Sequence, residues 1–253
     1  MLEIDRILKA MPSITLNEVK NIHLMERKDF KFITRVSFLP SLLEAMLPYF
    51  RVQVIKEKRM AHYSTQYLDT PHLDMFVMHQ NGILNRQKIR IRSYTDSNVS
   101  FLEIKNKNER GWTKKIRVPN HLPEVLSGKE LDTNKQFLLE NSFFDVNKLE
   151  PSLVSRFDRI TLVNNEKTER VTIDLNLSFV NCRTGKTKLL DKMVVIELKQ
   201  EGWRHSHFRD IIDQLRIQPF SFSKYCIGIA LTNPHVHYNR FEKKWTLTNK
   251  LEK

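Results

Sequence analysis

The segment Lys88-Ile89-Arg90-Ile91-Arg92 is the feature that most constrains how this chain can fold. In a β-strand, alternate side chains point to opposite faces, so three cations would lie on one face and two isoleucines on the other. The three cations would span about 13 Å, at ~3.3 Å per residue. If the isoleucines are buried, the cations must face either bulk solvent or an enclosed interior.

The same alternation of charged and aliphatic residues recurs along the chain. One such strand is typical of an antiparallel sheet with a single wet face. Several together, with cation-rich polar faces and few acids, favour a shared interior. Unit charges ~5 Å apart repel by roughly 3 kcal/mol at an effective dielectric of 20, so such an interior needs bound anions or water. The further segments are 101–107, 113–118, 156–159, 170–177 and 194–199.

Charge and length narrow the class of protein. The 253 residues carry 42 Lys+Arg against 29 Asp+Glu, a formal net charge of +13, so we expect an acidic partner: nucleic acid, phosphates or an anionic membrane surface. Strand faces poor in aromatic residues disfavour nucleic acid. The first residues do not resemble a secretory signal, and no stretch approaches the roughly 20 apolar residues of a membrane span, so we expect a cytoplasmic protein. We expect Cys182 and Cys226 to be buried, reduced thiols.

Strands separated by polar turns predict an α+β, mainly antiparallel fold with a few helices. Thr70-Pro71 is typical of the N-cap and first residue of a helix running to residue 79. The motif His205-x-His207 would share a face only on a strand, and it stands at a predicted helix start, so we expect a structural or solvent role for it. The basic residues 239–253 predict a solvated tail, with membrane-surface contact as the alternative. The other predicted helical segments are 38–50, 122–149, 203–217 and 220–231.

Six motifs in a fixed order carry a resemblance to a known family. They are Arg27-x-Asp29-x-Lys31-Phe32, Tyr67-Leu68-Asp69-Thr70-Pro71, Lys88-x-Arg90-x-Arg92, Glu103-x-Lys105, Glu197-x-Lys199 and Ser223-Lys224-Tyr225. Over roughly residues 24 to 232 the chain resembles the VTC domain, the catalytic domain of polyphosphate polymerases, in the triphosphate tunnel metalloenzyme (CYTH-like) superfamily. Two positions differ from the family pattern: Asp29 replaces the usual Glu, and Ser221 stands where the eukaryotic enzymes have a lysine.

The resemblance implies an eight-stranded closed antiparallel tunnel with helices packed outside. It implies a single domain over residues 1–253, with a core at about 24–232, an N-terminal extension at 1–23 and a basic C-terminal tail at 233–253. It also assigns roles to residues. The implied catalytic residues are Arg90, Arg92, Arg159 and Arg170. The implied phosphate-binding residues are Lys31, Lys88, Lys105, Lys115, Ser223 and Lys224. The implied ligands of Mn²⁺ or Mg²⁺ are Glu197 and Glu103, with orientation of Lys105 as the alternative role of Glu103.

The implied activity is that of a metal-dependent phosphotransferase, a polyphosphate polymerase that moves the γ-phosphate of ATP onto a growing chain. One alternative is a metal-dependent triphosphate hydrolase, and another is a non-catalytic polyphosphate-binding module. Related hydrolases typically carry an E-x-E-x-K strand with paired acids, whereas this chain has Arg27-x-Asp29-x-Lys31, which favours transfer to phosphate. The implied partners are ATP, polyphosphate or triphosphate, and a membrane-embedded protein that would hold the domain at the inner face of the membrane.

Overall fold

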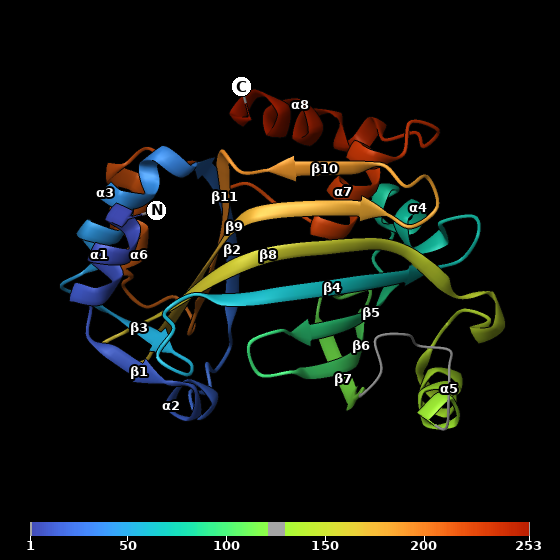
Figure 1. Ribbon diagram of the computed structural model, residues 1–253, viewed down its shortest axis with the longest axis horizontal. Helices are drawn as coiled ribbons and strands as arrows, with labels where there is room; N and C mark the ends of the chain where they lie inside the picture. The colour runs from blue at the N-terminus through green and yellow to red at the C-terminus, as the bar shows by residue number, and fades with distance from the viewer. Residues whose placement is uncertain (1, 121–129, 253) are drawn as a thin grey trace.

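Within residues 2–120 and 130–252, which the computed structural model describes, the chain forms one eleven-stranded sheet with helices around it (Figure 1). Eight strands follow one antiparallel path, in the order β2 (Lys28–Arg35), β11 (Met193–Gln200), β9 (Glu169–Asn181), β8 (Glu150–Asn164), β4 (Ala61–Asp69), β5 (Arg86–Tyr94), β6 (Val99–Lys107) and β7 (Thr113–Pro119). Three short strands join this path: β1 (Ser13–Thr15) pairs with β3 (Phe50–Val54), β3 with β8, and β10 (Thr187–Leu190) with β9.

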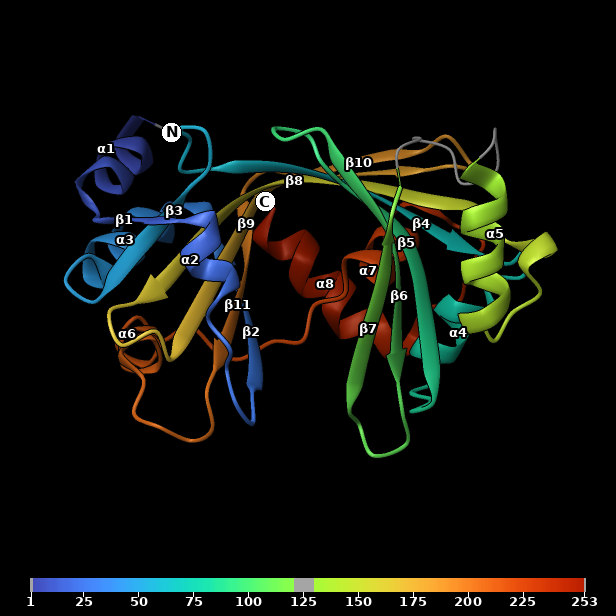
Figure 2. The ribbon, with the colours of Figure 1, turned by 90° about the horizontal axis from the view of Figure 1, so that it is seen from below.

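The sheet is curled into an arch. Figure 2 shows β8 and β4 across the top of the arch, with β11 and β2 on one side and β5 to β7 on the other. The predicted α+β, mainly antiparallel fold with helices around the sheet is confirmed. We call the hollow of the arch the groove.

Closure of the tunnel differs from the expectation of a hydrogen-bonded eight-stranded barrel. Among the described residues, β2 and β7 do not pair. The outer edge of β2 is taken instead by the segment before α7: Phe220 N donates to Lys31 O at 2.7 Å, and Phe32 forms a bridge with Pro219. Strand β7 ends the path with a charged, exposed edge, which protects it from pairing with another chain.

Helices cover the sheet in two main groups with separate apolar cores. The first core joins α1 (Leu2–Ala10), α3 (Leu39–Met46) and α6 (His207–Gln214) to aliphatic side chains of β8, β9 and β11. The second joins α4 (Asp74–Gln80) and α7 (Lys224–Thr232) to β4, β5 and β6. The isoleucines of Lys88-Ile89-Arg90-Ile91-Arg92 lie in the second core, so their strand exposes only its cationic face to the groove. The remaining helices are α2 (Leu16–Lys20), α5 (Glu130–Asn141) and α8 (Glu242–Leu251).

Several helix predictions were right in place and wrong in extent. Helix α3 ends at Met46 because Pro48 follows, and β3 begins at Phe50. Of the predicted segments 122–149, 203–217 and 220–231, only the central or later parts are helical, and residues 121–129 lie outside the described part of the chain.

In the part that the structure describes, no helix is long and apolar enough to cross a membrane. Both cysteines are free as expected, but Cys182 is exposed because it lies in the turn after β9.

The prediction that Thr70-Pro71 begins a helix is wrong. Helix α4 begins at Asp74, after a left-handed Leu73 with φ of 56°. The start of the helix is held by the buried carboxylate of Asp69, which accepts hydrogen bonds from the backbone N–H groups of Thr70 (2.8 Å), Met75 (3.0 Å) and Phe76 (3.1 Å). The hydroxyl of Tyr225 in α7 donates to the same carboxylate. Asp69 therefore ties β4 to both helices of the second core.

Residues 239–252 do not form the predicted solvated tail. Phe241, at the start of α8, is only 4% exposed and packs near Phe76 and His79. Thr248, on the same helix, is fully buried, and Arg240 Nη1 donates to Asn81 O at 2.6 Å. Helix α8 thus packs against α7, and the short 3-10 helix before it, which ends at Phe241, packs against α4 and α7.

We expect Asp69→Ala to lower the free energy of unfolding by at least about 3 kcal/mol, because three buried N–H groups lose their acceptor. Asp74→Ala is the matched control: Asp74 is less buried and accepts from the Thr70 hydroxyl, so we expect a loss of about 1 kcal/mol. Urea unfolding of both variants measures the difference. Equal losses would contradict the role of Asp69.

Candidate phosphate-binding site

Three neighbouring strands place charged side chains in register on the groove face. Lys88 and Arg90 of β5 lie opposite Lys105 and Glu103 of β6, and Lys105 in turn lies opposite Lys115 of β7. The alternate residues of β5 and β6 are aliphatic and buried, as the alternation predicted. The cations of this side therefore share one face because the strands share one register.

Glu103 is held between two cations of this face. Its Oε2 accepts from Arg90 Nε at 2.9 Å and Nη2 at 2.7 Å, and its Oε1 accepts from Lys115 Nζ at 3.0 Å. Burial by itself would raise the pKa of Glu103, but Arg90, Arg92 and Lys115 outweigh it and lower that pKa to about 2. The carboxylate is fully buried and both oxygens are engaged, so Glu103 fits the role of an orienting acid better than that of a metal ligand. It orients Arg90 and Lys115, not Lys105.

Asp174 of β9 is likewise held between two cations, on the other side of the groove. It accepts from Arg159 Nε at 2.6 Å and Nη2 at 2.8 Å, and Lys224 Nζ donates to the same carboxylate. Burial raises the pKa of Asp174, and the two cations more than reverse this and hold it below its usual range. Sequence reasoning did not assign Asp174 to the site. The pattern that could have identified it is its spacing from Arg170, which places both residues on the same face of the strand.

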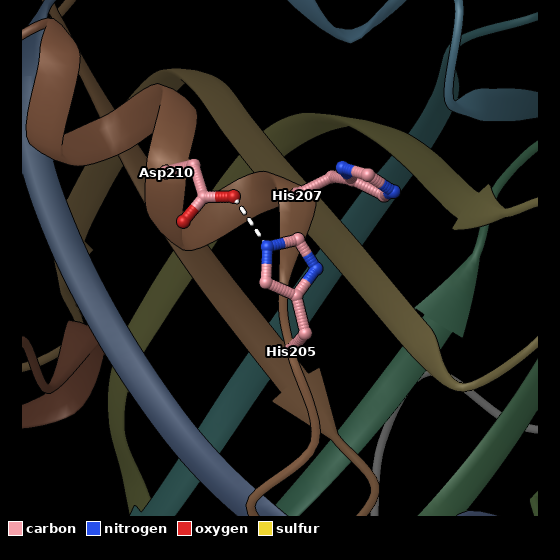
Figure 3. Close-up of side chains that lie close together, drawn as sticks. All are labelled: His205, His207 and Asp210. Carbon is pink, nitrogen blue, oxygen red and sulfur yellow. Dashed lines mark ion pairs between the residues drawn. The ribbon is translucent and has the colours of Figure 1, made fainter.

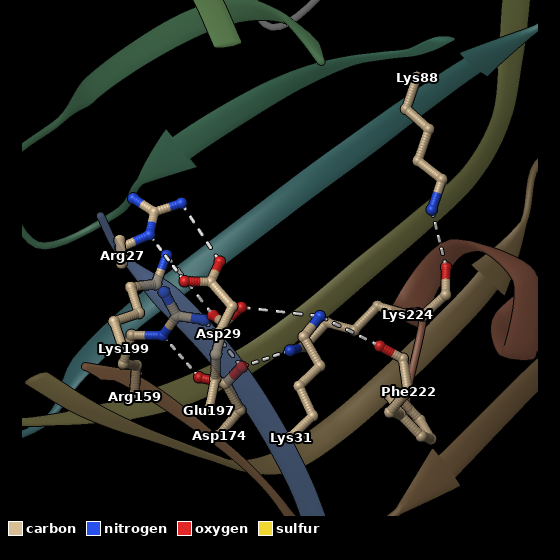
Figure 4. Close-up of polar contacts among 11 residues, drawn as sticks. Arg27, Asp29, Lys31, Lys88, Arg159, Asp174, Glu197, Lys199, Phe222 and Lys224 are labelled. Carbon is tan, nitrogen blue, oxygen red and sulfur yellow. Dashed lines mark hydrogen bonds and ion pairs between the residues drawn. The ribbon is translucent and has the colours of Figure 1, made fainter. Parts of the chain in front are cut away.

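Glu197 of β11 is the open acid of the groove (Figure 4). It lies opposite Lys31 in register, but its oxygens are 3.7 Å from Lys31 Nζ and 3.8 Å from Lys199 Nζ, beyond hydrogen-bond contact. Burial raises its pKa, and Lys199, Lys31 and Arg159 outweigh burial and lower it to about 2. By contrast, Asp29 is bound to Arg27 Nε at 2.7 Å. An ionised carboxylate without short bonds suits a divalent cation that prefers oxygen ligands.

Some cations of the groove have no carboxylate of their own. Within the described residues, the side chains of Lys105 and Arg170 make neither a hydrogen bond nor an ion pair, and Arg92 contacts Thr65 Oγ1 at 3.4 Å and lies over the Tyr63 ring. Lys105 is an exposed residue, and partial desolvation beside the other groove residues, followed by repulsion from Lys31 and Arg90, lowers its pKa to about 7. This excess positive charge is the property that an anion would satisfy.

The segment before α7 brings the last predicted residues into the groove. Lys31 Nζ donates to Phe222 O at 3.3 Å, and Lys88 Nζ donates to Ser223 Oγ at 3.0 Å. Ser223 is also the N-cap of α7 and accepts from Cys226 N, so the positive end of this helix points to the same place. Burial lowers the pKa of Lys88 and of Lys224 to about 8 in each case.

The structure therefore brings the predicted site residues together around one groove. Lys105 on one side interacts electrostatically with Lys31 and Glu197 on the other, and Arg159 interacts with Glu197 and Arg92. Lys115, rather than its neighbour Lys114, takes the groove side, as expected. The roles of these residues in binding and catalysis stay predictions.

A second cluster of possible ligands lies outside the groove (Figure 3). His205, His207 and Asp210 have ligand atoms within 4.8 Å of one another, because Ser206 between the histidines is extended. His205 Nε2 is 2.8 Å from Asp210 Oδ2, and the His207 ring stacks on Tyr49 at 4.1 Å. These contacts give both histidines a structural partner. Mn²⁺ and Mg²⁺ prefer oxygen ligands, so the cluster is a poor match for the predicted metal.

A family model described as the VTC domain matches residues 26–233, most of the chain. The chain belongs to the VTC domain family. The VTC domain is also similar in fold to solved structures. One is HpAC1 from Hippeastrum, an adenylyl cyclase candidate with a dominant triphosphatase activity: 12% identity, TM-score 0.51, covering 82% of this chain and 97% of that chain.

Another is PH1819 from Pyrococcus horikoshii OT3, with 15% identity and a TM-score of 0.43, covering 81% of this chain and 98% of that one. No curated protein sequence matches this VTC domain. At 12% identity, the similarity to HpAC1 supports the fold of the VTC domain alone.

We expect Asp174→Ala to destabilise the VTC domain by about 3–5 kcal/mol, because Arg159 and Lys224 stay buried without their shared carboxylate. Asp29→Ala is the control, since it breaks a more exposed pair with Arg27 and should cost at most about 1 kcal/mol. Denaturant unfolding without phosphate compares them. A loss for Asp174→Ala as small as the control would show that this carboxylate does not hold the groove together.

Binding of inorganic tripolyphosphate should weaken as pH rises from about 6.5 to about 8.5, because Lys105 has a pKa of about 7 and loses its positive charge in this range. Lys105→Arg keeps the charge throughout, so its affinity should fall less over the same range. Titration calorimetry of both proteins separates the contribution of Lys105 from the titration of the ligand. Parallel pH profiles would contradict the prediction.

Proposed function

We propose that this VTC domain transfers the γ-phosphate of ATP to a growing polyphosphate chain inside the groove. The observation that carries the proposal is the excess of cations around one open carboxylate: among the described residues, the side chains of Lys105 and Arg170 have no hydrogen-bond or ion-pair partner, and Glu197 has no short bond. A row of phosphates supplies the negative charge that these groups need. The closed ion pairs of Glu103 and Asp174 keep the surrounding cations in fixed positions.

Glu197 is the proposed ligand of Mn²⁺ or Mg²⁺. These ions commonly use one or two carboxylates and complete their shell with phosphate oxygens and water, and Glu197 is ionised, with no hydrogen bond to occupy it. When bound, the metal would neutralise charge on the phosphate oxygens and orient them. We propose Glu103 as the residue that positions Arg90 and Lys115.

The chemistry needs little from the protein beyond position and charge. An oxygen of the terminal phosphate of the chain attacks the γ-phosphorus of ATP, the bond from that phosphorus to the β–γ bridging oxygen breaks, and ADP leaves with that oxygen. The nucleophile is already an anion, so no general base is required. Arg90 and Arg159 have guanidinium groups locked by carboxylates and can bind phosphate oxygens without reorganising. Arg92 and Arg170, which lack such acids, add charge at the transferred group.

Hydrolysis of a triphosphate is the second candidate. The dominant triphosphatase activity described for HpAC1 raises it, since the two folds are similar. Activation of water would call for a second free acid, yet Asp29, Glu103 and Asp174 are each held in ion pairs. The occupied acids therefore favour phosphate over water as the acceptor. Binding of polyphosphate without turnover is the third candidate, and attachment to a membrane-embedded partner at the inner face of the membrane remains a proposal from the family resemblance.

Purified protein incubated with ATP and Mn²⁺ should produce polyphosphate chains and one ADP for each phosphate added. Glu197→Gln should reduce this rate at least about 100-fold through loss of metal binding, whereas Glu201→Gln, just beyond β11, should leave it within about twofold. Gel electrophoresis of the chains and an ADP assay measure both products. Inorganic phosphate without chains would establish the hydrolase, and tight polyphosphate binding with neither product would establish the binding module.

A further inference from the structure

Three lysines from three different elements donate to three successive residues at one end of the groove. Lys244 Nζ of α8 donates to Ser221 Oγ at 2.5 Å. Lys31 Nζ of β2 donates to Phe222 O at 3.3 Å, and Lys88 Nζ of β5 donates to Ser223 Oγ at 3.0 Å. The segment 221–223 is thus surrounded by positive charge from parts of the chain that are far apart in sequence.

Lys244 is held in this position by the packing of its helix. Residues on either side of it anchor α8: Phe241 is buried at the start of the helix, and Thr248 is buried one turn after Lys244. Lys244 itself is half-buried, whereas Lys243 is exposed on the same turn. Burial, and repulsion from Lys31, lower the pKa of Lys244. The helix therefore presents one particular lysine to the groove.

Of these three lysines, Lys31 has the Glu197 carboxylate 3.7 Å away, and the other two lack such a partner in the described part of the chain. Within the described residues, neither Lys88 nor Lys244 forms an ion pair with a carboxylate, and the acceptors of all three lysines are neutral oxygens. The nearby His79 is neutral because burial lowers its pKa to about 2, and burial raises the pKa of the Cys226 thiol. Each ammonium has three donors, so each keeps donors for a further ligand.

We propose that Lys244, Lys31 and Lys88 form a phosphate subsite around residues 221–223, which binds one phosphate group of tripolyphosphate or of a polyphosphate chain. The inference rests on the proposed function and extends it, because it makes the C-terminal helix part of the substrate site. Lys244 is a binding residue in this assignment: its ammonium contacts a phosphate oxygen while Ser221 keeps the side chain extended toward the groove.

The test measures binding of inorganic tripolyphosphate and of long-chain polyphosphate to the full chain by titration calorimetry. Lys244→Gln should weaken binding of at least one of the two ligands about tenfold, the loss of one hydrogen bond to a charged group. Lys243→Gln makes the same charge change one residue away on an exposed side chain, and should change affinity less than about twofold. Lys244→Arg, which keeps the charge, should restore most of the affinity.

Two outcomes overturn the subsite in distinguishable ways. If wild-type protein binds either ligand and Lys244→Gln binds both as well as Lys243→Gln does, the subsite is wrong and the proposed function stands. If wild-type protein binds neither ligand, both fail.

A measurement on the unaltered protein guards against a variant that does not fold. Reductive methylation of lysines, followed by mass spectrometry, should show Lys244 protected several-fold by tripolyphosphate or polyphosphate while Lys243 reacts as before. Unchanged reactivity of Lys244 at saturating ligand would overturn the subsite.

Discussion

Repulsion among confined cations is the constraint on which the rest of this structure depends. Strands from both sides of the arch direct Lys and Arg side chains into one groove, where like charges would separate the strands if nothing balanced them. Glu103 balances one side and Asp174 the other, each by accepting from two cations at once. These acids leave an excess of positive charge in the groove, and that excess is the basis of the proposed binding of phosphate.

The acids of the groove divide into two kinds, and burial alone does not separate them. Glu103, Asp174 and Glu197 all have pKa values lowered by neighbouring cations against the effect of burial. Glu103 and Asp174 achieve this through short hydrogen bonds, so their oxygens are occupied. Glu197 achieves it through charges at 3.7 and 3.8 Å, so its oxygens stay available. The same electrostatic field therefore produces fixed acids that shape the site and one acid that is free to take part in it.

The arch is completed by the C-terminal part of the chain rather than by pairing of its end strands. The segment 219–223 pairs with β2 and receives a hydrogen bond from Lys88 of β5, so it bridges the two sides of the groove. Helix α7 continues from this bridge and α8 packs on α7. Residues that come last in the sequence thus connect the two sides of the groove and contribute the charge of Lys244 at one of its ends.

The sequence by itself determined which side chains share a face, because the period of two in a strand is a local property. From that period alone, Lys88, Arg90 and Arg92 were placed opposite buried isoleucines, and the charged residues of β6, β9 and β11 were grouped correctly. The sequence could not show which strand lies opposite which, because register and β-bulges depend on long-range pairing. The ion pairs of Asp174 with Arg159 and Lys224 were therefore not predicted. Only the tertiary structure decided that the oxygens of Glu103 are occupied while those of Glu197 are open. It also decided that basic residues predicted as a solvated tail pack as a helix beside the groove. Both outcomes depend on distance and burial rather than on residue type.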